Sequence, residues 1–469
     1  MTSKTGLTDK NIQKKHVSPM ESEKISRLLI KFAIPSVVSM VVNALYNIVD
    51  QIFIGQGVGY LGNAATNVAF PLVTITMAVS LMTGNGAAAL YSLRLGAKDR
   101  QSASDAVGSA VGIMIVTGML LLISGLMFFR PLLSLFGATD AVMPYAVEYT
   151  RIIIIGLPFM VVSTGLNALI RADGSPKYSM YSMLAGAAIN IVLDPLFIFV
   201  FDMGVAGAAV ATIIGQFASM ILSLRYLSMF KNVIIKREIF RIKKDVAKKI
   251  FSFGASSFVT QMSITLVQIT INNTIRHFGA MSVYGTDIPL SVIGIVMKVN
   301  MVVTSVILGI AIGSQPIWGY NYGAGRFDRV RKTYRISIMS ASVFSITGFL
   351  VFQIFTPQVV GIFGSESQLY NEFAVMAFRV FLSGIFVLGF QITSAIYFQA
   401  VGKPLKSAFL SLLRQALLLA PLAFILPSIY GLEGLLYAGP VADITSSVVT
   451  AGFILYEMRK MKRMDKVIE

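Results

Sequence analysis

Long apolar runs, separated by short polar segments, dominate the pattern along this chain. They fall at about 28–54, 63–90, 105–129, 143–168, 178–201, 205–228, 250–275, 286–316, 333–356, 372–400, 404–428 and 432–456. Each run is long enough to cross roughly 30 Å of bilayer hydrocarbon as an α-helix. Charged residues make up only 13% of the 469 residues, whereas soluble domains carry about 25%. The pattern therefore predicts an all-α polytopic membrane protein with twelve transmembrane helices.

Lysine and arginine are divided very unevenly between the two sides of the predicted bundle. Thirty-three of the 39 lie in segments on one side, and only Arg130 and Arg276 lie on the other. This is the positive-inside pattern of membrane proteins, so the net charge of +17 does not indicate a nucleic-acid partner. We expect a multi-pass protein of the cell (plasma) membrane with both termini cytoplasmic. No cleavage site follows the first apolar run, which favours a retained helix over a signal peptide.

The second half of the chain repeats the first at an offset of 227 residues. Gly204 and Gly207 match Gly431 and Gly434 in this way. Each half holds six spans, so both halves enter the membrane in the same sense as parallel repeats. Such repeats place the substrate path in a central cavity at their interface and rock against each other. A duplicated structural bundle without transport is the plainer alternative.

The repeats define the expected domain organisation. It comprises a cytoplasmic polar tail at 1–27, an N-lobe of six helices at 28–228, a basic cytoplasmic linker at 229–249, a C-lobe of six helices at 250–456 and a basic cytoplasmic tail at 457–469. The nine basic residues between 225 and 249 favour contact with anionic membrane lipids. We expect the protein to act as a monomer.

Polar residues recur at helical spacing inside three spans of the N-lobe. They are Asn43, Asn47 and Asp50 in span 1, Asn190 and Asp194 in span 5, and Thr212 and Gln216 in span 6. Counting from the outer ends of the spans places Asp50, Asp194 and Thr212 about 7–12 Å below the outer surface. Pro195 removes a backbone donor from span 5, which frees a carbonyl and can kink the helix. The predicted depth brings two carboxylates, an amide and a hydroxyl to one level.

Intramembrane carboxylates are costly and usually functional. Two of them in a low-dielectric pocket can take up a proton together, and the same oxygens suit Na⁺. We therefore predict a cation or proton site at Asp50, Asn190, Asp194 and Thr212, without any other cofactor. The chain has no cysteine and two isolated histidines, His16 and His277, which argues against a zinc or haem site. In a purely structural explanation, Asp50 caps a helix or binds a tyrosine, and Asp194 pairs with an asparagine.

The C-terminal half lacks the two acids. It reads Leu419-Ala420-Pro421 around the position equivalent to Asp194, so the proline is kept and the acid is lost. Ion coupling is accordingly expected in the N-lobe alone, with Asp443 of span 12 as the exception to watch. The basic residues Lys298, Arg379 and Arg414 also lie inside spans of this half. Lys298, in the middle of span 8, needs a carboxylate, a carbonyl or a water-filled cavity.

Several of these segments together resemble the multidrug and toxic compound extrusion (MATE) family, most closely its prokaryotic DinF-like and MepA-like branches. They are Asp50 with Gly55, Asn190 to Pro195, Gly204 to Thr212, and Gln315-Pro316 before Tyr320 to Ala324. The resemblance covers about 28–456. In one respect the chain departs from the family. Members tend to carry an acidic residue in span 7, where this chain has Gln261 and Gln268 instead.

The resemblance implies an antiporter, not an enzyme, that exports amphipathic, often cationic drugs and toxic compounds by alternating access as H⁺ or Na⁺ enters. It assigns Asp50, Asn190, Asp194 and Thr212 to a cation site and matches Tyr149 to a tyrosine of span 4. Further candidates for the cavity or for substrate binding are Asn43, Asn47, Tyr149, Asn167, Gln216 and Lys298. A lipid-linked oligosaccharide flippase of the same fold is the alternative, but it would need a strongly basic cavity. A membrane transferase is disfavoured because the loops carry no catalytic constellation.

Overall fold

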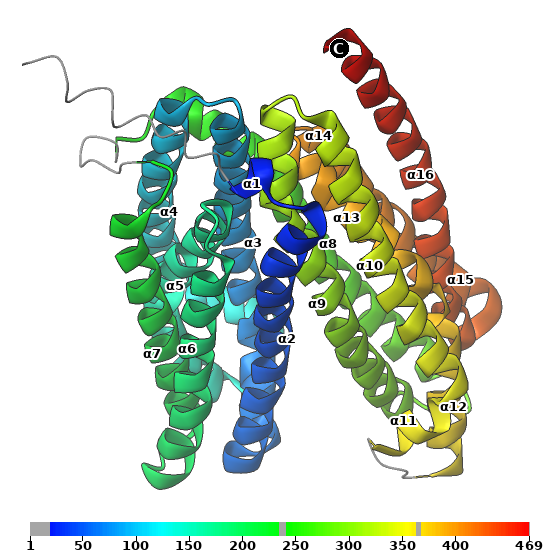
Figure 1. Cartoon of the computed structure of the whole chain (residues 1–469). Helices are drawn as coiled ribbons and strands as arrows, with labels where there is room; N and C mark the ends of the chain where they lie inside the picture. The colour runs from blue at the N-terminus through cyan, green and yellow to red at the C-terminus, as the bar shows by residue number, and fades with distance from the viewer. Residues whose placement is uncertain (1–18, 234–240, 363–366, 469) are drawn as a thin grey trace, which may run out of the picture.

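The computed structural model describes residues 19–233, 241–362 and 367–468, which are almost entirely helical (Figure 1). Most of the predicted tail at 1–27, including His16, and the middle of the predicted linker lie outside the described residues. The helices form two groups that stand side by side, blue to green and green to red in Figure 1. We call the end of the molecule that holds α1 (Pro19–Ser22) and the last turns of α16 (Gly434–Ile468) the tail end, and the opposite end the far end.

The first group, the N-lobe, contains six long helices joined by short turns. They are α2 (Ile25–Val58), α3 (Tyr60–Gly96), α4 (Arg100–Leu135), α5 (Met143–Ala172), α6 (Pro176–Pro195) and α7 (Gly204–Arg225). A π-helical turn, η1 (Leu196–Val200), follows α6 directly after Pro195. Proline cannot donate the backbone hydrogen bond that would continue the α-helix, so the wider turn occurs where the sequence predicts a disturbance.

The second group, the C-lobe, is more irregular. Its elements are α8 (Lys244–Gly279), α9 (Asp287–Gly323), α10 (Phe327–Ile354), α11 (Thr356–Ile362), α12 (Gln368–Phe381), α13 (Leu388–Ala400), α14 (Pro404–Leu412), α15 (Ala420–Tyr430) and α16. A π-helical stretch, η5 (Leu413–Leu419), joins α14 to α15. The helix α8 begins at Lys244, so the end of the segment expected to be a linker is already helical.

The predicted span 372–400 is not one continuous helix. A tighter 3₁₀ stretch, η4 (Leu382–Val387), separates α12 from α13. Gly384 in this stretch lies so close to α16 that an added Cβ would stand 2.8 Å from the backbone of Pro440. The break therefore coincides with a close approach of two helices, which hydrophobicity alone does not reveal.

Eleven stretches of the described chain are long and apolar enough to cross a membrane. The last of them, Pro404–Met464, contains two passes that reverse at Gly431, whose φ of 65° favours glycine. The structure thus agrees with twelve spans, six in each lobe, and confirms the predicted fold class.

The duplication extends to the backbone of the turns. Gly204 and Gly431 both have positive φ, 53° and 65°. The turn after α3 places Lys98 at φ 62°, and the equivalent turn after α9 places Gly325 at φ 70°. Equivalent turns of the two lobes therefore share a left-handed conformation, although only one of this last pair is a glycine.

The two lobes touch through small residues toward the tail end. Gly86 of α3 packs against the backbone of Gly254 in α8, and Gly309 and Gly313 of α9 pack against Val37 and Ala33 of α2. One apolar core continues from the N-lobe into Ile250 and Ile317 of the C-lobe. From these contacts α2 and α9 diverge toward the far end (Figure 1).

Candidate cation-binding site

Three neighbouring helices of the N-lobe bring the predicted cation ligands together. Asp50 lies on α2, Asn190 and Asp194 lie on α6, and Thr212 lies on α7. The amide of Asn190 donates to Asp194 Oδ1 over 3.1 Å and to Thr212 Oγ1 over 3.3 Å. The carboxyl groups of Asp50 and Asp194 lie within hydrogen-bonding reach of each other. These four residues, which the sequence places at one depth, therefore lie together in the structure.

The cluster is buried and its oxygens are only partly used. Asp194 is fully buried and Asn190 is 3% exposed. Asp50 Oδ1, Asn190 Oδ1 and Asp194 Oδ2 have no hydrogen-bond partner among the described residues. Unsatisfied buried oxygens are costly, because each has lost its contact with water. Three such atoms in one cluster fit a bound proton or a small oxygen-liganded cation such as Na⁺.

Two tyrosines border the carboxylates. Tyr46 lies one turn before Asp50 on α2, and Tyr149 of α5 is 8% exposed. Both hydroxyls are close enough to Asp50 and Asp194 to interact electrostatically with them. The site is therefore enclosed by aromatic rings on the α2 and α5 sides.

Three other polar candidates lie near the cluster without bonding to the carboxylates. The Asn47 amide donates to the backbone carbonyl of Asn43 over 2.6 Å. This bond holds the Asn47 side chain against its own helix, α2. Asn47 is exposed, whereas Asn43 is half-buried. Gln216 lies one turn from Thr212 on α7 and faces Gly156 of α5.

Two further candidates lie elsewhere. Asn167 is 2% exposed near the tail end of α5, where its amide donates to Ser163 and Ser223 and its Oδ1 accepts from Ser179. These bonds join α5, α6 and α7, so Asn167 serves packing rather than the cation cluster. Lys298 is exposed on α9, in the other lobe.

The C-lobe contains a buried ion pair that the sequence did not predict as a pair. Arg414 Nε donates to Asp443 Oδ1 over 2.7 Å, and both side chains are nearly buried. The sequence contained a signal for this pair, because Arg414 and Asp443 each lie near the middle of a predicted span and so at a similar depth. Arg379 is exposed on α12, where its Nε donates to Thr356 Oγ1 over 3.4 Å.

Asp173, at the tail end of α5, is a buried carboxylate that the sequence analysis did not identify. It accepts hydrogen bonds from the hydroxyls of Tyr91 and Tyr226, from the backbone of Lys231 and from the side chain of Asn232. Because its oxygens are fully used, Asp173 fastens the start of the linker to the N-lobe and is not a candidate cation ligand.

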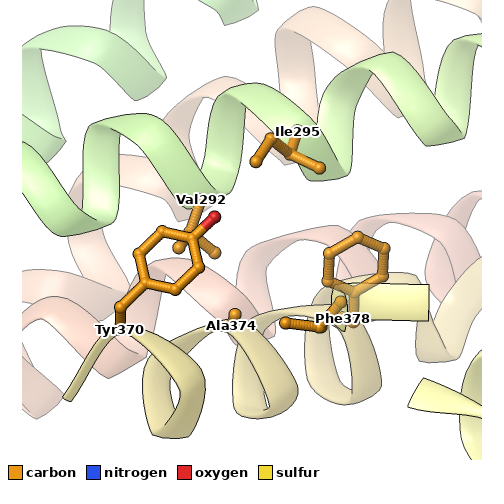
Figure 2. A pocket seen from close by; sticks show the side chains of 6 residues that line it. Val292, Ile295, Tyr370, Ala374 and Phe378 are labelled. Carbon is orange, nitrogen blue, oxygen red and sulfur yellow. The ribbon is translucent and has the colours of Figure 1, made fainter. Parts of the chain in front are cut away.

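A small pocket lies between α9 and α12 of the C-lobe (Figure 2). It is lined by Val292, Ile295, Val360, Tyr370, Ala374 and Phe378, and it has no room for a water molecule. It is a packing imperfection of the C-lobe, not a binding site. Within the described ranges no three His, Cys, Asp or Glu side chains form a metal-binding group.

Comparison with known proteins relates this geometry to a family. The family model MatE matches residues 35–196 and 257–425. The multidrug export protein MepA of Staphylococcus aureus (strain MSSA476) is 24% identical over 448 residues, covering 95% of this chain and 96% of that protein. MepA of Staphylococcus haemolyticus (strain JCSC1435) is 25% identical over 454 residues, with the same coverage.

Solved structures show the same fold. A MATE transporter in complex with MaL6 has a TM-score of 0.89 at 24% identity, covering 95% of this chain and 99% of that one. A transporter of the MOP superfamily from Pyrococcus furiosus, for which a reversed polarity of the binding pocket suggests a different function, has a TM-score of 0.88 at 23% identity. The match covers 95% of this chain and 98% of the Pyrococcus furiosus chain.

Proposed function

This chain belongs to the MatE family, and we propose that it is a cation-coupled antiporter that exports amphipathic, often cationic drugs by alternating access. It is a multi-pass membrane transporter and not an enzyme. The coupling ion, H⁺ or Na⁺, would occupy Asp50, Asn190, Asp194 and Thr212. The observation that carries the proposal is the facing pair of Asp50 and Asp194, with unpartnered oxygens on both.

The chemistry of the pair supports exchange between an ion and a cationic drug. Two like charges at hydrogen-bonding distance in a buried site cannot both persist without a counter-charge. A proton or Na⁺ can supply that charge, and so can the positive group of a drug. If only one of them satisfies the site at a time, binding of the ion favours release of the drug. The path of the drug to this site would be lined by Tyr46, Tyr149, Asn43, Asn47 and Gln216.

The distribution of basic residues supports an orientation. We propose that the tail end is cytoplasmic and that the membrane is the plasma membrane, as the positive-inside rule predicts. The lobes would then touch on the cytoplasmic side and diverge toward the outside, so that the cation cluster faces the outer half of the membrane. We further propose that the protein works as a monomer, with the basic linker resting on anionic lipids.

Flux in reconstituted vesicles tests the proposal. Dye efflux should respond to one imposed gradient, proton or sodium, when each is applied separately. Asp194→Asn should abolish that efflux while the protein still inserts, because the neutral amide cannot exchange a cation. Asp202→Asn is the matched control, since Asp202 is an exposed carboxylate beyond the end of the same span. Normal efflux by Asp194→Asn would refute the assigned coupling site.

The flippase alternative has less support. Lys298, Arg379 and Arg414 are its candidate pyrophosphate ligands, but Arg414 is already paired with Asp443. The three lie on α9, α12 and η5, and within the described part of the chain no hydrogen bond or shared ion-pair partner links them. Binding assays with an organic cation and with a lipid pyrophosphate separate the two functions, and we expect only the cation to bind competitively with the coupling ion.

A further inference from the structure

A short segment at the start of the described chain crosses from one lobe to the other. Residues 20–23, which we call the strap, comprise most of α1 and the residue after it, and they lead directly into α2 of the N-lobe. α1 lies at the tail end of the molecule (Figure 1), where it contacts α9 of the C-lobe. The strap therefore belongs to the N-lobe by sequence and touches the C-lobe in space.

Two arginines at the start of the C-lobe helix α10 bind the strap. Arg326 donates to the backbone carbonyl of Glu21 over 3.0 Å and to Glu21 Oε1 over 2.5 Å. Arg329 Nη2 donates to the backbone carbonyls of Met20 and Glu23 over 3.0 and 2.8 Å. Hydrogen bonds from a charged donor are roughly twice as strong as neutral ones. The two guanidinium groups thus bind three of the four carbonyls of the strap.

The end of α9 completes the binding surface for the strap. Asn321 is fully buried, and its Nδ2 donates to the carbonyl of Met20 over 3.4 Å. Its Oδ1 accepts a bond from Arg329 Nε over 3.1 Å, which orients that arginine. The hydroxyl of Tyr320 donates to Glu21 Oε2 over 3.5 Å. Most of these bonds go to backbone carbonyls, so the C-lobe binds the path of the strap more than its side chains.

The strap is attached to the N-lobe as well. α2 begins at Ile25, two residues after the strap ends. Met20 is 6% exposed and belongs to the apolar core that also holds Leu28 and Phe32 of α2 and Ile317 of α9. The tail ends of the lobes cannot separate unless the strap gives up its contacts with one of them.

The bonds to the C-lobe are the ones that can be exchanged for water. The side chain of Arg326 is 42% exposed and that of Glu21 is 22% exposed, so water can replace each as the partner of the other. Met20, by contrast, would expose apolar surface if it left the core, and its link to α2 is covalent. Separation of the lobes should therefore detach the strap from the arginines and leave it on the N-lobe.

We propose that the strap holds the tail end closed and is released from Arg326 and Arg329 each time the tail end opens. The inference rests on the proposed function, since it assumes alternating access. In the present conformation the lobes touch at the tail end, and the strap is bound. Bonds that exist in only one of two conformations shift the equilibrium toward that conformation. The strap therefore favours the conformation in which the far ends diverge.

The populations of the two conformations test the role of the strap. The natural chain has no cysteine, so Arg100→Cys and Leu405→Cys carry the only two spin labels. Both positions are exposed, at the tail ends of the N-lobe and the C-lobe. The distance between the labels is measured in vesicles without drug. We expect Arg326→Gln and Arg329→Gln each to raise the ratio of long to short distances about tenfold, equivalent to roughly 1.4 kcal/mol.

Two further variants serve as controls. Arg335→Gln removes an exposed arginine farther along α10 and should leave the ratio unchanged. Glu21→Gln should raise the ratio less than Arg326→Gln does, because the carbonyl of Glu21 keeps its bond to the arginine. An unchanged ratio in both Arg326→Gln and Arg329→Gln overturns the inference, and so does an equal shift in Arg335→Gln.

A reversible lock tests whether the strap is released during transport. Glu21→Cys and Arg326→Cys are combined in one chain and joined by a short, cleavable bismaleimide. Drug efflux from vesicles should stop while the linker is intact and return when it is cleaved. Each single-cysteine variant, treated with the same reagent, should continue to transport. Continued efflux by the joined protein overturns the inference.

These results are separable from the test of the coupling site. If Asp194→Asn transports normally while the arginine variants shift the distance ratio, the coupling site is wrong and the strap keeps its role. If Asp194→Asn loses efflux while the ratio does not change in either arginine variant, only the role of the strap is wrong. One fixed distance in the parent and in every variant, under either ion gradient, would contradict alternating access and overturn both.

Discussion

Asn190 donates its side-chain amide to Asp194 over 3.1 Å, one helical turn farther along α6. The same amide reaches Thr212 on α7, so one side chain fixes the carboxylate and joins the two helices. A hydrogen bond to a charged group is worth about 1.5–3 kcal/mol. The orientation of Asp194 in the candidate site therefore depends on Asn190.

We predict that Asn190→Ala weakens the apparent affinity for the coupling ion by at least about tenfold, the equivalent of roughly 1.4 kcal/mol. The reason is that Asp194 loses the donor that orients it. Drug transport measured against ion concentration checks the change. Gln391→Ala is the control, because it removes a buried amide of the C-lobe that donates only to a backbone carbonyl. An unchanged ion dependence in Asn190→Ala would show that the amide serves packing alone.

The arrangement of Asn190, Asp194 and Thr212 could be predicted from the sequence because depth in a membrane helix follows from counting residues. The twelve spans and the duplication followed from hydrophobicity and glycine positions in the same way. Side-chain partners did not follow, because hydrophobicity cannot say which face of one helix meets which face of another. Arg414 therefore remained unassigned, and Asp173 was missed.

The break between α12 and α13 was missed for a related reason. Residues 382–387 contain no proline, and Gly384 is the weakest helix former among them. Gly384 is also the residue of this stretch that α16 approaches closely. A tertiary contact of this kind leaves no periodic signal in the sequence.

The Arg414–Asp443 pair should contribute strongly to stability when only one partner is removed. Breaking a buried ion pair typically costs about 3–5 kcal/mol, because the remaining charge is left uncompensated. We predict that Asp443→Asn lowers the thermal midpoint of the purified protein markedly. The double variant Arg414→Met/Asp443→Leu should recover most of the loss. If the double variant is as unstable as Asp443→Asn, the cost comes from packing around Asp443 and not from the unpaired arginine.

Asp173 should control the attachment of the linker. Removing its carboxylate in Asp173→Ala leaves the hydroxyls of Tyr91 and Tyr226 and the backbone of Lys231 without their acceptor. Each buried group left unsatisfied costs about 1–3 kcal/mol. We expect faster trypsin cleavage at Lys231, measured against Asp245→Ala, which removes an exposed acid at the start of α8. Equal cleavage of the two variants would exclude the fastening role.

Lys98 offers a stabilising substitution. It has φ 62°, while the equivalent turn of the other lobe has Gly325 at φ 70°. A left-handed conformation costs a residue other than glycine roughly 1–2 kcal/mol. Lys98 is exposed, so Lys98→Gly removes strain without removing packing. We predict that its thermal midpoint rises and that Gly325→Lys lowers it. A lower midpoint for Lys98→Gly would show that the lysine has a compensating contact.

The contact between the lobes at Gly86 should be required for the conformation in which the far ends diverge. A Cβ at Gly86 would stand 2.8 Å from the backbone nitrogen of Gly254, so Gly86→Leu must push α3 away from α8. The neighbouring pair Asn85 and Ser257, joined by a 3.0 Å hydrogen bond, reports the contact when both are replaced by cysteine. We expect rapid disulfide formation in the parent and little in the Gly86→Leu background. Gly452→Leu, which adds its side chain where no atom lies within 4 Å, should leave the disulfide unchanged. Persistence of the disulfide in Gly86→Leu would mean that the helices adjust locally, and that the glycine contact does not set the distance between the lobes.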